Sequence, residues 1–245
     1  MPMRTLTLAL GLALLAAEPA LGQAITLDLG AEGGSLTARV AQLFILITLL
    51  SLAPGLAIML TCFPFMVTAL SILRQAIGVQ QAPPNMMIVS LALFLTYFVI
   101  EPVFQEAWRE GVQPLIDGTI EEEEGVARAF EPFRVFMEGR VSPRTLSVML
   151  EASPMRDSLD PADRPPVAVL IPAFLLSEIQ RGFEVGFLIF LPFLVIDLVI
   201  ASVLMSMGMM MVPPAVVALP FKLAFFVVAD GWTLLAGALV RGYAP

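Results

Sequence analysis

One long stretch without a charged residue limits most strongly which folds this chain can adopt. Between Arg39 and Arg74 lie 34 uncharged, mostly apolar residues. As one helix they would measure about 51 Å, against about 30 Å for the hydrocarbon core of a bilayer. The chain is 58% hydrophobic and 14% charged, whereas soluble domains carry about 25% charged residues. The sequence therefore predicts an all-α membrane protein with about four hydrophobic elements, arranged as helical hairpins with kinked or broken helices.

Prolines and glycines predict where the first of these helices ends. Because Pro54-Gly55 and Pro64 interrupt the uncharged stretch, we expect a span or half-span to about Met59 and then a kinked continuation to Arg74. Gly78 is the expected helix stop.

A second apolar element is expected to complete a first helical hairpin over residues 40–100. Pro83-Pro84-Asn85 marks the loop and starts the helix. The apolar run over residues 86–100 is closed by Glu101-Pro102. It is short for a bilayer span, as the first stretch is long, so both are expected to pack mainly against protein.

The residue types exclude several kinds of site. The chain has no histidine and Cys62 is its only cysteine, which rules out histidine triads, zinc sites built on histidine and cysteine pairs, and intramolecular disulfides. In its apolar surroundings Cys62 is expected to be a small buried hydrophobe. We expect neither an enzyme nor a cofactor or metal site.

Residues 1–22 have the form of a signal peptide. Arg4 supplies the positive charge, an apolar run follows, and Ala20-Leu21-Gly22 provides small residues for cleavage after Gly22. The mature chain would then begin with a short extracytoplasmic segment over residues 23–39. The alternative is an uncleaved interfacial or short transmembrane helix.

Residues 101–166 form an acidic insert. They carry 14 acidic and 7 basic side chains, which accounts for nearly all of the formal net charge of −8. Phe130, Phe133, Phe136 and Met137 recur with helical spacing. The insert is expected on the extracytoplasmic (periplasmic) side of a bacterial inner membrane, and its acidity argues against nucleic-acid binding.

Residues 167–245 are predicted to form a second helical hairpin that carries ionisable groups at membrane depth. Such groups are costly in a bilayer and are expected to face protein and seek partners. The residues are Glu178, Arg181, Glu184, Asp197, Lys222 and Asp230. The first three recur every three residues and can form a ladder on one helix face.

Helix arithmetic argues against pairing Asp197 with Lys222. If straight helices turn at Pro213-Pro214, Asp197 lies about 24 Å from the turn and Lys222 about 12 Å. Lys222 is then expected to find its partner on another element or another subunit. Asp197 and Asp230 would need separate cations or a retained proton.

Five methionines surround Gly208 just before the double proline. In helical register Met205 and Met209 share a face, whereas Met207, Met210 and Met211 point elsewhere. One packing stripe therefore does not explain them. Gly208 would let the chain leave its helix, and Pro213 and Pro214 would limit how far the loop collapses.

The sequence around this loop resembles the FliP family of the flagellar type III secretion export gate. The runs that carry the resemblance are residues 196–205, 208–214, 218–223, 230–232, 73–76, 80–85 and 91–96. Departures are Glu101 before Pro102, Arg140-Val141-Ser142 within the insert, and Gln180-Arg181 where the family has a lysine directly after its Ser-Glu-aliphatic motif.

The resemblance implies a subunit that assembles with copies of itself and with FliQ and FliR into a pore-forming export gate of the basal body. Unfolded flagellar proteins would pass through it. The family's methionine loop, which seals the closed pore, corresponds to Met209, Met210 and Met211, with Gly208, Pro213 and Pro214 as its hinges. The buried charges Glu178, Arg181, Asp197, Lys222 and Asp230 would serve assembly.

Two other functions stay open at this point. The first is the homologous gate subunit of an injectisome, against which the signal peptide argues. The second is a multi-pass small-solute transporter with a midplane site at Asp197 and Lys222. An intramembrane enzyme is disfavoured, because no nucleophile and base pair is visible.

Overall fold

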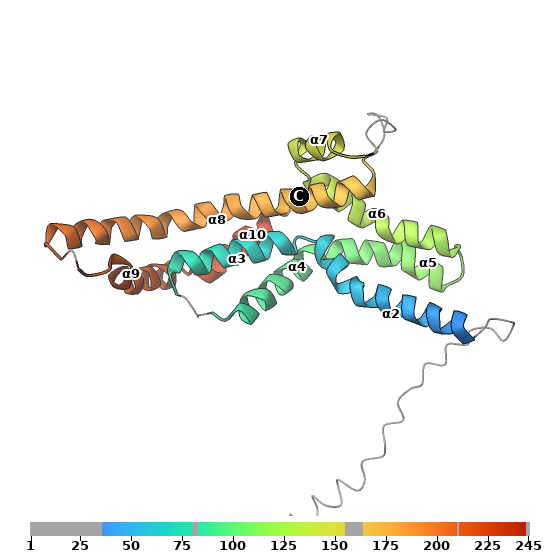
Figure 1. Ribbon diagram of the computed structural model, residues 1–245, viewed down its shortest axis with the longest axis horizontal. Coiled ribbons are helices and arrows are strands. Elements are labelled where there is room, and N and C mark those ends of the chain that lie inside the picture. The colour runs from blue at the N-terminus through green and yellow to red at the C-terminus, as the bar shows by residue number, and fades with distance from the viewer. Residues whose placement is uncertain (1–35, 80–82, 155–163, 210, 244–245) are drawn as a thin grey trace, which may run out of the picture. The chain divides into compact units, whose positions relative to one another are not determined.

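The computed structural model describes residues 36–79, 83–154, 164–209 and 211–243 (Figure 1). The proposed signal peptide lies outside them. The chain divides into two units, residues 1–51 and residues 52–245, and each is taken by itself. Helix α2 (Leu36–Met59) begins in the first unit and ends in the second; all the helices that follow belong to the second. The regular structure of the described residues is helical throughout, which confirms the all-α fold class.

The first break falls where the prolines predict it. Helix α2 ends at Met59, and α3 (Phe63–Ile77) begins with Pro64 in its first turn. Gly78 ends α3 in a left-handed conformation, φ 86°, and its N–H donates to the carbonyl of Arg74. The ends predicted at Met59 and Gly78 are confirmed, whereas Pro54-Gly55 does not interrupt α2.

The expected helix end at Glu101-Pro102 is wrong. Helix α4 (Asn85–Ala107) runs through Pro102 and continues as a π-helical turn (Trp108–Val112) and α5 (Gln113–Ile116). A proline inside a helix removes one hydrogen bond and costs about 3 kcal/mol, so packing must hold this helix together. At Gly111 a Cβ would overlap the backbone of Ala129, which shows how closely α6 lies against the run.

The insert folds back on α4 and α5 as a helical hairpin. Helix α6 (Glu122–Arg140) confirms the helix expected from the phenylalanine spacing. Phe133 packs edge-on against Phe104 of α4, with ring centroids 5.2 Å apart, and Phe136 packs against Phe174 at 5.9 Å. Helix α7 (Pro143–Glu151) then packs on α8.

The most extensive contact in the second unit joins α3 to α8 (Val167–Ser206). Gly182 and Gly186 lie one turn apart on α8, and a Cβ at Gly182 would stand 2.9 Å from Cβ of Thr68. At Gly186 it would overlap Ile72. This is the small-xxx-small spacing that lets two membrane helices approach closely.

Among the residues that the structure describes, two helical runs are long and apolar enough to span a membrane, residues 85–116 and 167–206. Helices α9 (Pro214–Val228) and α10 (Gly231–Arg241) meet at 63° and together form a third candidate span or a re-entrant pair. The bend is made at Asp230, whose φ of 49° is the one left-handed non-glycine conformation in the described part of the chain. Asp tolerates this region better than most residues.

Candidate functional site: the methionine loop and its charged support

The methionine loop, residues 207–213, begins with a glycine-terminated helix end. After Ser206 ends α8, the N–H of Gly208 donates to the carbonyl of Met205, and the N–H of Met209 donates to that of Leu204. Gly208 has φ 74°. This pair of bonds is the Schellman motif, in which glycine takes the left-handed position without a Cβ penalty. The structure therefore ends α8 several residues before the double proline.

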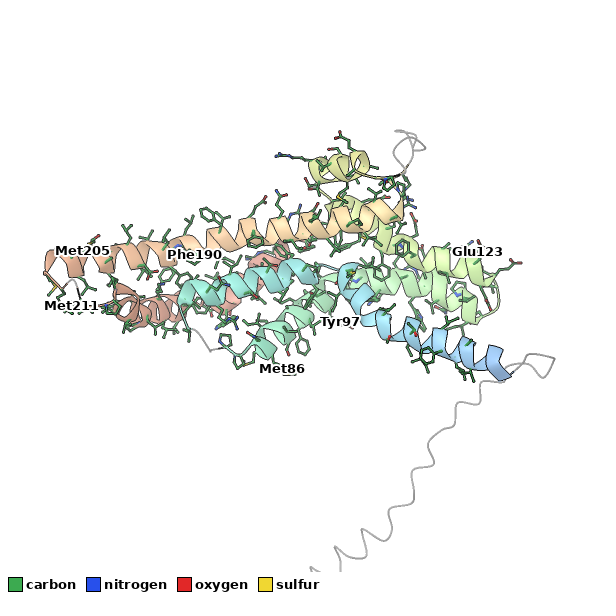
Figure 2. The ribbon with its side chains drawn as sticks, viewed as in Figure 1. Met86, Tyr97, Glu123, Phe190, Met205 and Met211 are labelled. Atoms are coloured by element: carbon green, nitrogen blue, oxygen red, sulfur yellow. The ribbon has the colours of Figure 1, made fainter. Side chains whose placement is uncertain are left out.

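The described methionine side chains of this loop, and Met205 at the end of α8, are exposed. The exposed fractions are 61% for Met205, 67% for Met207, 41% for Met209 and 97% for Met211. Figure 2 shows Met205 and Met211 together at the tip of the α8–α9 hairpin. Met210 lies outside the described residues. Pro213 precedes α9 and Pro214 is its first residue, so the loop is bounded by glycine at one end and proline at the other.

The expectation that Lys222 and Asp197 cannot meet is wrong. Nζ of Lys222 lies 2.6 Å from Oδ2 of Asp197. The arithmetic started from Pro213, but α8 ends at Ser206, nine residues after Asp197, and Lys222 lies eight residues after Pro214. These distances are about 13.5 Å and 12 Å. The two side chains are level once the loop is excluded from the helix.

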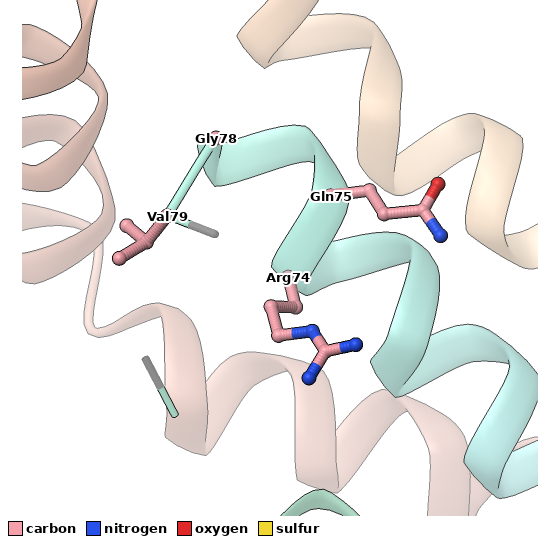
Figure 3. A pocket seen from close by; sticks show the side chains of 4 residues that line it. All are labelled: Arg74, Gln75, Gly78 and Val79. Atoms are coloured by element: carbon pink, nitrogen blue, oxygen red, sulfur yellow. The ribbon is translucent and has the colours of Figure 1, made fainter. Parts of the chain in front are cut away.

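Lys222 also binds the end of α3. Its ammonium donates to the carbonyl of Ala76 at 3.0 Å, and a cation there complements the negative end of the helix dipole. Beside this contact, Arg74, Gln75, Gly78 and Val79 line a hollow of about 350 Å³ (Figure 3). Arg74 also donates to the side-chain oxygen of Asn85 in α4. Lys222 thus joins three helices, α3, α8 and α9.

The other predicted charges fall into two groups. The Glu178 side chain is fully buried and lies 3.6 Å from Arg181, which is 37% exposed. The helix-face ladder stops there, because Glu184 accepts instead from Gln180 at 2.8 Å. Asp230 is exposed and accepts from the hydroxyl of Thr233. The expectation that Asp230 is buried is wrong for the single chain, because it lies at the bend between α9 and α10.

Cys62 lies in the core between α2 and α3, as expected for a structural thiol. Burial, with a smaller effect from the Glu178 charge, raises the pKa of the Cys62 thiol to about 12. The thiolate needed for nucleophilic chemistry is therefore disfavoured.

Sequence reasoning missed two features of this region. The Gly182 and Gly186 pair could have been found from its four-residue spacing in an apolar run. The contact of Lys222 with a backbone carbonyl of α3 could not have been found from the sequence, because no side-chain pattern identifies which carbonyl accepts the hydrogen bond.

Comparison with known proteins gives consistent matches along the chain. The FliP family matches residues 46–239. The flagellar biosynthetic protein FliP of Agrobacterium fabrum is 49% identical over 211 residues, covering 86% of each chain. That of Caulobacter vibrioides is 48% identical over 96% of this chain and 88% of the relative. That of Bacillus subtilis is 42% identical over 82% of this chain and 91% of the relative.

Proposed function

This chain belongs to the FliP family, and on that basis we propose that it is a core subunit of the flagellar type III protein export gate. The family is a transmembrane part of the flagellar export apparatus and not an enzyme. In the proposal, copies of this chain assemble with FliQ and FliR in the inner membrane at the basal body. Unfolded flagellar proteins pass through the channel that they form.

The observation that carries the proposal is the outward display of methionines at one hairpin tip. An exposed apolar tip of this kind is costly in water and calls for a partner surface. Repeated around a ring of subunits, the tips would meet and close a pore. Methionine suits this task, because its flexible thioether side chain can seal against water and re-form around polypeptides of any sequence.

The hairpin also has a rigid support behind the loop. Lys222 and Asp197 cross-link α8 and α9, and Lys222 ties both to α3. The loop is therefore the part of the hairpin that is free to adapt, while its base is held. This arrangement fits a seal that opens and closes locally.

The sealing role is tested by replacing Met209, Met210 and Met211 with alanine. We expect assembly with the other gate subunits to survive and the membrane to leak ions or small solutes, measured as a loss of membrane potential. The matched control replaces Met86 and Met87 of α4, which are 81% and 61% exposed but lie outside the loop. A loop variant whose membrane stays as tight as that of the control would overturn the sealing role.

Two observations bear on the alternatives. The relatives named above are flagellar proteins, which favours the flagellar gate over an injectisome gate. Asp197 and Lys222 bind each other, so a transporter site built on them would lack a free charge. The signal peptide, with cleavage after Gly22, and the extracytoplasmic acidic insert remain parts of the proposal.

A further inference from the structure

The segment that follows α10 returns to a buried carboxylate in the middle of the chain. The hydroxyl of Tyr243 donates to Oε2 of Glu178, a residue of α8 that is completely buried. The two residues are 65 positions apart in the sequence. This contact therefore joins α8 to the end of the described chain.

Arg140, the last residue of α6, holds the same segment from the other side. Its Nη1 donates to the carbonyl of Gly242 at 3.0 Å, and its guanidinium carbon lies 3.9 Å from the centre of the Tyr243 ring. That geometry is a cation–π contact. Nε of Arg140 also lies 3.7 Å from Oε1 of Glu178. The same arginine therefore contacts Glu178 as well as Gly242 and the Tyr243 ring.

Aromatic neighbours from α3 and α6 fix the tyrosine ring. Phe65 of α3 meets it edge-on with centroids 5.3 Å apart, and Phe136 of α6 stacks on it at 6.2 Å. Four parts of the second unit, namely α3, α6, α8 and the residues after α10, converge on this one side chain.

The hydroxyl of Tyr243 satisfies a group that is otherwise poorly satisfied. Oε1 of Glu178 lies at salt-bridge distance from Arg140 and Arg181 but makes no hydrogen bond within the described residues. The Tyr243 hydroxyl supplies the hydrogen bond that Oε2 receives. A buried carboxylate that loses its hydrogen bonds carries the full cost of desolvation, so Glu178 favours conformations in which Tyr243 is docked.

Apolar contacts also hold α10, since Trp232 meets Phe226 of α9 edge-on and Leu235 packs against two core clusters. Leu239 is its one buried residue over 231–241. Its preceding neighbour, α9, leaves at 63°. The contacts beyond its end add polar bonds to this packing and hold the C-terminal end of the helix.

We propose that Gly242 and Tyr243, gripped by Arg140 and Glu178, form a clasp that fixes α10 against the junction of α3, α6 and α8. The clasp keeps α9 and α10 in their bent arrangement. It also couples the position of α10 to the end of α6, which lies within the acidic insert.

The clasp is tested by hydrogen–deuterium exchange on the full chain in membrane nanodiscs. Tyr243→Phe keeps the ring and removes the hydroxyl, and we expect amides of residues 239–243 to exchange at least about tenfold faster, as for loss of a hydrogen bond to a charged group. Amides of α3 should be unchanged. Tyr97→Phe is the matched control, because Tyr97 is 64% exposed on α4 and the chain has only two tyrosines.

Exchange in Tyr243→Phe equal to that of wild type and Tyr97→Phe would overturn the clasp. If Tyr243→Phe fails to accumulate, Arg140→Lys decides, since it keeps the charge near Glu178 but loses the planar fork that reaches Gly242. Faster exchange confined to residues 239–243 supports the clasp in that variant, and unchanged exchange contradicts it. This readout does not depend on export activity, so it stands apart from the test of the methionine loop.

Discussion

At the scale of single residues, the pairing of Lys222 with Asp197 turns on where one helix ends. The Lys222 side chain is 8% exposed and that of Asp197 33%, and Oδ1 of Asp197 has no hydrogen-bond partner among the described residues. The pair is thus largely removed from water and incompletely satisfied. The pair therefore serves mainly to join helices and adds little to the net free energy of folding, because the attraction in a buried ion pair often only offsets the cost of removing its charges from water.

Replacing both members of the pair should lower the free energy of unfolding by less than the two single replacements added together. We expect Lys222→Met or Asp197→Leu to lower the free energy of unfolding by about 3 kcal/mol, because each leaves a buried group without its partner. The double variant should lose less than the sum of the two. Denaturant unfolding in detergent micelles measures all three, with Glu184→Gln on the exposed face of α8 as control. Strict additivity would contradict the pairing.

A second ionic cluster in the insert makes stability depend on pH. Arg164 donates to both carboxylate oxygens of Glu138, at 3.1 Å and 2.7 Å, and Arg134 donates at 3.0 Å. Hydrogen bonds from Arg164 above all hold the pKa of Glu138 below its usual value of 4.5. Because the folded pKa is the lower one, Glu138 stabilises the fold above pH 4.5, and this contribution is lost as the pH falls through the folded pKa.

Glu138→Gln should therefore lower the melting temperature at about pH 7, and its effect should shrink as the pH falls towards about pH 3. Parallel thermal unfolding of wild type and variant across this range measures the difference. Glu151→Gln, at the exposed end of α7, is the control and should show a smaller difference at neutral pH. A Glu138→Gln effect that is equal at both pH values would rule out the ionised carboxylate as its cause.

These residues also show what the sequence can and cannot reveal. Local chemistry predicted the ends at Met59 and Gly78, because proline and glycine act on the backbone next to them. Helix lengths measured from Pro213 separate Lys222 from Asp197, because they leave out the helix end that Gly208 makes after Ser206. The contact between Glu178 and Tyr243 joins residues 65 positions apart, and no local pattern encodes it.

At the scale of elements, the same principle explains the errors and the successes. The phenylalanine spacing predicted α6 because one face of that helix packs against its neighbours. Pro102 failed to end α4 because α6 packs closely on the continuation, at Gly111. A tertiary contact of this kind outweighs the local cost of a proline, and it is invisible until the partner helix is placed.

The Schellman end of α8 can be tested with a pair of matched glycines. Gly208 and Gly118 have similar φ values, 74° and 66°, and at neither site would an added Cβ have a neighbouring atom within 4 Å. Alanine at either site should cost about 1 kcal/mol of local stability, because left-handed conformations disfavour a Cβ.

Only Gly208→Ala should also disturb the seal. We expect it to raise ion leakage through the membrane, whereas Gly118→Ala in the acidic insert should not. Membrane-potential measurements on cells that express each variant distinguish the two. Equal leakage in the two variants would show that backbone strain alone causes the leakage, wherever it lies, and would contradict a specific role of the methionine loop.

At the scale of the whole molecule, the proposed topology places the acidic insert and the start of α4 on opposite sides of the membrane. The run over residues 85–116 measures about 48 Å as a helix, enough to cross a bilayer core of about 30 Å. Figure 2 shows Met86 at the start of α4 and Glu123 on the insert. Cysteine labelling can locate both.

A membrane-impermeant maleimide should label Glu123→Cys in spheroplasts, and Met86→Cys only after permeabilisation. The native Cys62 should contribute little background, because it is buried and its pKa is raised to about 12. Wild type measures that background. Labelling of Met86→Cys alone in sealed spheroplasts would reverse the proposed orientation.

Because α8 is long, a small tilt at one end produces a larger displacement at the other. From Glu178 to Ser206 the helix advances 28 residues, or about 42 Å. A pivot of about 5° at Glu178 would therefore sweep the far end through about 4 Å, close to the spacing of two touching carbon atoms. The same pivot at Pro192 acts over half that arm and moves the end by about 2 Å. A lever of this length converts a tilt too small to break the packing at one end into a displacement that opens or closes contacts at the other.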